Sequence, residues 1–159
     1  MKYRRLTNEE LQQVEKEFIT FLAANSVTAD DWKKLNKQEP SKAEMLVEIF
    51  SDIVIEKALN KCDCLEKVSP FEFRAYKFFE NFVKLIVVKI EPNEKINLTQ
   101  GELGKNIQLA LTQTPDNVEF FHAKKEYKKL REQEMFEVLQ SGAYMTNDSL
   151  FSQLNRLIA

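Results

Sequence analysis

The sequence predicts an α+β fold, with an N-terminal segment of three helices, a small antiparallel sheet at about residues 62–90, and C-terminal helices on the same core. Three observations predict it. Apolar residues recur at helical spacing over the first 60 residues, alternate with polar residues between 62 and 90, and return to helical spacing near the end of the chain. The 159 residues, 43% apolar and 30% charged, fit a single domain over 1–159 and exclude a disordered chain.

The three N-terminal helices are predicted from their first residues and their apolar stripes. Thr7 and Glu10 have the spacing of a capping box, and the apolar stripe that follows runs to about residue 25. Residues 28–31 repeat this pattern for a short helix that ends before Pro40. Ser41 opens a third helix to about residue 60. Its apolar residues cover well over half of the circumference, so we expect it to be the most buried of the three.

Strands are predicted where the period changes. Residues 62–68 and 71–78 alternate between apolar and polar, and Glu80–Asn81 has the composition of a hairpin turn. Residues 82–90 are apolar on both faces, which predicts a central strand covered on both sides. The sequence therefore predicts at least three antiparallel strands.

For part of the remaining chain, the sequence leaves helix and strand open as alternatives. Residues 99–111 fit a helix or a strand, and residues 118–121 fit an edge strand or the first turn of a helix. The spacing of apolar residues predicts one helix over residues 124–141, and Gly142 is expected to end it as the C′ residue. A last short helix is predicted after Thr146 or Asn147.

Charge and cysteine content bear on the class of partner and the compartment. The formal charge is −2, from 23 basic and 25 acidic residues, whereas a nucleic-acid binder of this size usually carries a net positive charge. The opening residues lack the apolar region of a secretory signal, and the longest apolar run, Leu85–Val88, is too short to cross a bilayer. We expect Cys62 and Cys64 to be reduced, metal-free and directed into the core, and the protein to be cytoplasmic and not associated with a membrane.

The residues that could carry chemistry do not form a known site. His122 is the only histidine, so any catalytic triad must use it, and no G-x-S-x-G motif is present. Glu119 and His122 match one half of a di-metal helix-bundle site, but the second histidine is missing. Cys62, Cys64 and His122 offer zinc three ligands without a fourth. Residues 101–106 depart from a phosphate-binding loop, and residues 74–79 depart from an RNA-binding strand motif. The sequence therefore predicts no catalytic, cofactor-binding or metal-binding residues.

Two charged segments are candidate interaction surfaces. One is an acidic stripe on the third predicted helix, whose members lie four residues apart: Glu44, Glu48, Asp52 and Glu56. The other is a basic run on the predicted helix 124–141, where two adjacent rows are formed by Lys124, Lys125, Lys128, Lys129 and Arg131. We expect each to be a solvated helix face, to pair with the other within a chain or across a homodimer, or to bind a partner of opposite charge.

Three segments resemble a family of small uncharacterised bacterial proteins that is classed only as a domain of unknown function. They are the opening Met1-Lys2-Tyr3-Arg4-Arg5-Leu6-Thr7, the stretch from Phe18 to Trp32, and Arg131-Glu132-x-Glu134-x-Phe136 leading to Gly142-Ala143. The resemblance covers about half of the chain. It implies a stand-alone cytosolic bacterial protein, and it assigns no activity or ligand to any residue.

The absence of the common catalytic motifs favours a non-enzymatic protein-interaction or binding module, acting on a protein partner or as a homodimer. The alternative is a hydrolase or transferase of carboxylate chemistry, with Glu48 and Asp52 as base or metal ligands. Weak nucleic-acid binding through residues 124–131 is a third hypothesis. An enzyme requires a concave pocket with a carboxylate of raised pKa. A module requires an exposed apolar patch rimmed by charges. Nucleic-acid binding requires the cations to share one uninterrupted face.

Overall fold

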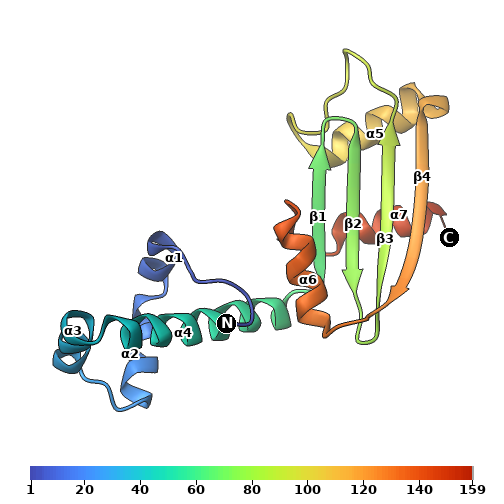
Figure 1. Ribbon diagram of the computed structural model, residues 1–159. Coiled ribbons are helices and arrows are strands. Elements are labelled where there is room, and N and C mark those ends of the chain that lie inside the picture. The colour runs from blue at the N-terminus through green and yellow to red at the C-terminus, as the bar shows by residue number, and fades with distance from the viewer. Residues whose placement is uncertain (159) are drawn as a thin grey trace. The chain divides into compact units, whose positions relative to one another are not determined.

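The computed structural model describes residues 1–158 and has an α+β fold, as the sequence predicts (Figure 1). Its residues group into two compact units, Met1–Ala58 and Leu59–Ala159, which are described separately. Among the residues described, no helix is both long enough and apolar enough to cross a membrane.

The first unit contains α1 (Asn8–Gln13), α2 (Glu15–Ala24), α3 (Ala29–Gln38) and most of α4 (Pro40–Lys61). Both predicted capping boxes form, at Thr7 and Thr28. One helix was expected to span residues 7–25, and this is wrong: Val14 leaves the helical conformation (φ −114°, ψ 27°) and separates α1 from α2. A β-branched residue forms a helix less readily, and apolar spacing alone does not detect such a break.

The core of the first unit is aromatic. Phe50 of α4 is 3% exposed, and its ring centroid lies 4.9 Å from that of Phe18 and 5.4 Å from that of Phe21. Trp32 packs edge-on against Phe18, with ring centroids 5.2 Å apart. As expected, α4 is the most buried of these helices, although part of its surface remains exposed. An apolar row on α4 is exposed by 46–59%, at Met45, Ile49 and Ile53.

The second unit is built on a five-stranded antiparallel sheet of order β4-β3-β2-β1-β5. The three strands predicted between 62 and 90 are β1 (Cys64–Ser69), β2 (Glu72–Phe78) and β3 (Phe82–Ile90), and β3 lies inside the sheet as expected. The edges are formed by β4 (Val118–Glu126) and the short β5 (Tyr144–Thr146), which pairs with β1.

Helices cover both faces of this sheet. On one face lie α5 (Leu103–Gln113) and α7 (Ser149–Ile158), and a 3₁₀ turn, η1 (Pro115–Asn117), follows α5 (Figure 1). Their residues Ile107, Ala110, Phe151 and Leu154 form the main core with the inward side chains of β2 and β3. On the opposite face lies α6 (Arg131–Gln140), next to β1 (Figure 1). Its Val138 lines a pocket together with residues of β2, β3 and β4.

The structure decides between the open alternatives and corrects one prediction. Residues 103–113 are helical, and residues 118–121 belong to the edge strand β4. A single helix over 124–141 is wrong, because β4 continues to Glu126 and α6 begins only at Arg131. Pairing with β3 along nine residues overrides the helical propensity of Ala123–Glu126. Gly142 does follow the helix, with φ +105°, as predicted.

Candidate functional site

The acidic stripe on α4 lies against the first residues of the chain. The Asp52 carboxylate accepts hydrogen bonds from the backbone N–H groups of Lys2 (2.6 Å) and Tyr3 (2.9 Å). The Lys2 ammonium pairs with Glu56, and Arg5 forms an ion pair with Glu44. Glu48 is half-buried. Three of the four carboxylates therefore hold the N-terminal segment on α4, and Asp52 is engaged by backbone donors.

The basic run does not form two rows on one helix, so that prediction is wrong. Lys124 and Lys125 point to opposite faces of β4, Lys128 and Lys129 lie in the following loop, and Arg131 is the first residue of α6. The Arg131 guanidinium donates to the carbonyl oxygen of Cys62 at 2.9 Å. These cations do not share the uninterrupted face that nucleic-acid binding through this segment requires.

Glu134 of α6 organises the loop that carries the basic run. Its carboxylate is 7% exposed, pairs with the Lys125 ammonium at 2.7 Å, and accepts the backbone N–H groups of Lys128 (2.9 Å) and Lys129 (3.3 Å). The hydrogen bond from Lys125 is the main reason that the pKa of Glu134 is lowered, and the two backbone donors add to it. These contacts indicate a structural role for the carboxylate.

The structure separates the residues that could have bound metal. Glu119 and His122 lie three positions apart on β4, so they face opposite sides of the sheet. Two strands, β2 and β3, lie between β4 with His122 and β1 with Cys64. Cys64 is buried, and Cys62 is half-buried just before β1. Within residues 1–158, no group of three or more His, Cys, Asp or Glu side chains is placed to hold a metal ion.

A large groove lies between α5, β5 and α7, with a volume of about 950 Å³. This is near the upper end of the range of typical ligand pockets. Its wall is mainly aliphatic and is contributed by both helices: Leu103, Ile107, Leu111, Leu150, Leu154 and Leu157. The rim carries neutral amides and hydroxyls, together with the ion pair of Glu102 and Lys105.

One charged side chain, Glu66 of β1, lies inside this groove. It is 5% exposed, and its Oε2 accepts a hydrogen bond of 3.0 Å from the hydroxyl of Tyr144 on the paired strand β5. No lysine or arginine of residues 1–158 forms an ion pair with it. Burial raises the pKa of Glu66, and the Tyr144 hydrogen bond opposes that shift only in part. Burial likewise raises the pKa of Tyr144 to about 12, so the phenol remains a donor at neutral pH.

The sequence analysis missed Glu66 because its candidate residues were chosen from charge runs and short motifs. Glu66 is in phase with Cys64 and Val68 along β1, and all three lie on the face covered by α5 and α7. A single carboxylate at an inward position of a strand is a recognisable signal, because buried acidic residues are rare unless they are paired. Its position within a groove depends on β5 and α7, which no local pattern specifies.

The chain belongs to a family of unknown function, DUF6495, whose sequence model matches residues 1–159. No curated protein and no solved structure matches the chain.

Proposed function

We propose that the protein is a non-enzymatic binding module. It recognises a segment of a partner protein in the groove between α5, β5 and α7. The partner segment presents apolar side chains to the aliphatic wall and one lysine ammonium to Glu66. The observation that carries the proposal is the buried Glu66 carboxylate, which lines the groove without a cationic partner.

The charge of Glu66 specifies the chemistry of the occupant. A carboxylate that is removed from water without a cation is unfavourable, and one hydrogen bond from Tyr144 offsets only part of that. An ammonium placed beside Glu66 restores the missing interaction and favours the ionised carboxyl. A lysine side chain suits this groove, because its four-carbon stem can follow the aliphatic wall while the charge reaches the carboxylate.

The form of the groove favours a segment of protein over a small amine. The groove is open along two helices, and Leu157 at its edge is 63% exposed. Small ligands usually have most of their surface enclosed, whereas helical and extended segments bind in open apolar grooves. The exposed apolar row on α4 also fits the class of interaction modules, since Lys42 and Lys57 flank it in sequence.

A bacterial, cytoplasmic setting agrees with this proposal. The free thiols of Cys62 and Cys64 suit a reducing compartment, and the resemblance of the opening residues to small bacterial proteins points the same way.

The proposal is tested by titrating the ¹⁵N-labelled full chain with a pentapeptide in which a central lysine is flanked by leucines. The reference peptide carries glutamine in place of the lysine. We expect saturable shifts at α5, β5 and α7 with the lysine peptide, and about tenfold weaker binding of the glutamine peptide, as expected for one charged hydrogen bond.

Glu66→Gln keeps the size of the side chain and removes its charge, so it should abolish the preference for lysine. Glu102→Gln makes the same change of charge on the exposed rim and serves as the matched control, which should retain the preference. Equal binding of both peptides by the wild type, or equal loss in both variants, would contradict the role of Glu66. A concentration-dependent dimer with the groove resonances broadened would instead identify the occupant as a second copy of the chain.

A hydrolase or transferase of carboxylate chemistry remains the second candidate, on one observation. A carboxyl of raised pKa inside a concave groove is the arrangement expected of a general acid or base. Here the residue is Glu66 and not Glu48 or Asp52. Turnover of ester or phosphoester substrates that disappears in Glu66→Gln, with the fold unchanged, would favour this candidate over the binding module.

A further inference from the structure

A row of three lysines crosses the sheet on the face that carries α7. Lys77 of β2 is directly opposite Lys84 of β3, and Lys84 is directly opposite Lys124 of β4. Side chains paired in this way have Cβ atoms about 4.5–5.5 Å apart, and like charges at such positions destabilise a sheet. A row of like charges on neighbouring strands therefore needs a compensating anion.

The protein supplies that compensation to only one of the three. The Lys77 ammonium lies 3.2 Å from the Asp148 carboxylate. In the part of the chain that the structure describes, Lys84 and Lys124 form no ion pair, and their contacts are with aromatic rings. The Lys124 ammonium lies 4.1 Å from the centroid of Phe82, and that of Lys84 lies 5.9 Å from the centroid of Phe79. These rings position the lysines but do not neutralise them.

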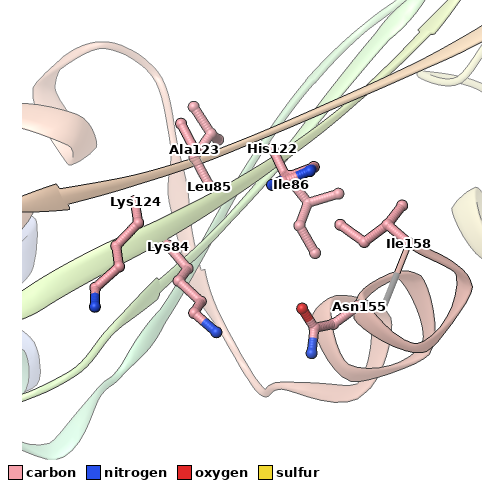
Figure 2. A pocket seen from close by; sticks show the side chains of 8 residues that line it. All are labelled: Lys84, Leu85, Ile86, His122, Ala123, Lys124, Asn155 and Ile158. Atoms are coloured by element: carbon pink, nitrogen blue, oxygen red, sulfur yellow. The ribbon is translucent and has the colours of Figure 1, made fainter.

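The two uncompensated lysines border a hollow of about 100 Å³ between β3, β4 and α7. Figure 2 shows Lys84 and Asn155 extending toward each other across this space, with His122 above it. The backbone groups of His122 and Asn155 belong to β4 and α7, but their side chains form no hydrogen bond within residues 1–158, so both side chains are available to a ligand. Ile86 and Ile158 form the apolar part of the wall. The hollow is thus lined by two lysines, an imidazole and an amide, and no carboxylate lines it.

We propose that this hollow binds the phosphate group of a small molecule, held by Lys84, Lys124, His122 and Asn155. A phosphate group offers several acceptor oxygens and negative charge, which match the donors that two strands and a helix place around the hollow. The inference does not rest on the groove with Glu66, because the two sites share no lining residue.

The dimensions favour a single phosphate group over a nucleic-acid strand. The hollow holds several times the volume that one ordered water needs, which is room for one tetrahedral oxyanion. A strand of RNA or DNA is instead followed by a long positively charged groove. The other lysines of β3 and β4, Lys89 and Lys125, lie on the opposite face, next to Glu72 and Glu134 respectively.

The test uses the ¹⁵N-labelled full chain, titrated with inorganic phosphate at constant ionic strength set by chloride. We expect saturable shifts confined to β3, β4 and α7, and a higher thermal midpoint in phosphate than in chloride. Lys84→Gln with Lys124→Gln should weaken phosphate binding at least about tenfold. The matched control is Lys89→Gln with Lys125→Gln, which makes the same change of charge on the same two strands but on the opposite face, and it should leave the affinity within about twofold.

Asn155→Ala provides a second variant that changes no charge, and it should weaken phosphate binding several-fold. Equal weakening in the two lysine double variants would overturn the proposal, since it would show general screening in place of a site. The absence of saturable shifts up to about 50 mM phosphate would also overturn it. So would a single-stranded RNA that binds far more tightly than phosphate and shifts residues well beyond the hollow.

Discussion

Replacing Phe50 by alanine tests the aromatic core of the first unit. The ring is 3% exposed and lies against Phe18 and Phe21. Removing a buried aromatic side chain forfeits about 2–3 kcal/mol of transfer free energy. The two ring contacts add about 1–2 kcal/mol. We therefore expect Phe50→Ala to lower the free energy of unfolding by about 3–5 kcal/mol, as is typical when a packed core loses a phenylalanine ring.

Urea unfolding measures this loss, and the chain contains a suitable probe. Trp32 is the only tryptophan and packs on Phe18, so its fluorescence reports on this core, while far-UV circular dichroism reports on all helices and strands. If residues 1–159 unfold as the single domain that the sequence predicts, the two transitions coincide. Phe121→Ala is the matched control, because Phe121 is 48% exposed and should lose less than about 1 kcal/mol. A loss below about 1 kcal/mol for Phe50→Ala would refute the reasoning.

Four further outcomes are expected. Glu134→Ala should lose about 2–3 kcal/mol in urea at pH 7, because two backbone N–H groups and Lys125 lose their acceptor. Since the pKa of Glu134 is lowered in the folded state, its contribution is complete above the ordinary glutamic acid pKa and is lost as the pH falls through the folded value. An equal deficit of Glu134→Ala at pH 7 and pH 2 would therefore contradict this assignment. Burial raises the pKa of Cys64 to about 12, so iodoacetamide should modify Cys64 only after unfolding, as read by intact mass. Native mass spectrometry should show no zinc, and one zinc per chain would contradict the expectation for Cys62 and Cys64. Replacing three lysines of the basic run by glutamine, at positions Lys124, Lys128 and Lys129, should lower the free energy of unfolding by about 1 kcal/mol or less. The effect should be smaller at high salt. A larger loss, or one insensitive to salt, would show that these lysines do more than form exposed contacts.

The elements that the sequence predicted correctly are those whose signals are local. The capping boxes at Thr7 and Thr28 form as expected, and the alternation over residues 64–78 and the double-sided run 82–90 become strands. A capping box or an alternating strand is recognised within a few residues, so neighbours distant in the sequence are not needed to identify it.

The failures occurred where partners distant in the sequence decided the outcome. Residues 118–126 became a strand because β3 offered a free edge, although Ala123–Glu126 is a favourable helical sequence. Pairing of the acidic stripe with the basic run was one of three alternatives, and in the structure Asp52 and Glu56 contact Lys2 and Tyr3 near the start of the chain. Both charged segments have several possible partners at the level of sequence, and charge alone does not select among them.

The candidate sites could not be predicted for the same reason, and the register of the sheet shows why. On the face covered by α5 and α7, side chains form rows across the strands, and each row takes one residue from each strand. One row contains Thr146, Cys64, Lys77, Lys84 and Lys124, and the next contains Tyr144, Glu66, Ala75, Ile86 and His122. Along any single strand these residues are isolated polar positions in an alternating pattern. Only the pairing of five strands brings Tyr144 onto Glu66 and aligns three lysines.

These two rows explain why one face of the sheet can carry the two proposed binding sites, which have opposite charge preferences. Most of that face is apolar core, formed by residues such as Phe73 and Val88. Its charged exceptions include Glu66 near the β5 edge, Lys84 near the start of β3 and Lys124 near the end of β4. These residues border the two hollows that α5, β5 and α7 leave on this face. Uncompensated charges lower stability, and a protein selected only for stability would replace them with apolar residues. Their position beside two concave spaces agrees with the two proposals, in which each charge meets its counterpart on a ligand, an ammonium at Glu66 and a phosphate at Lys84 and Lys124.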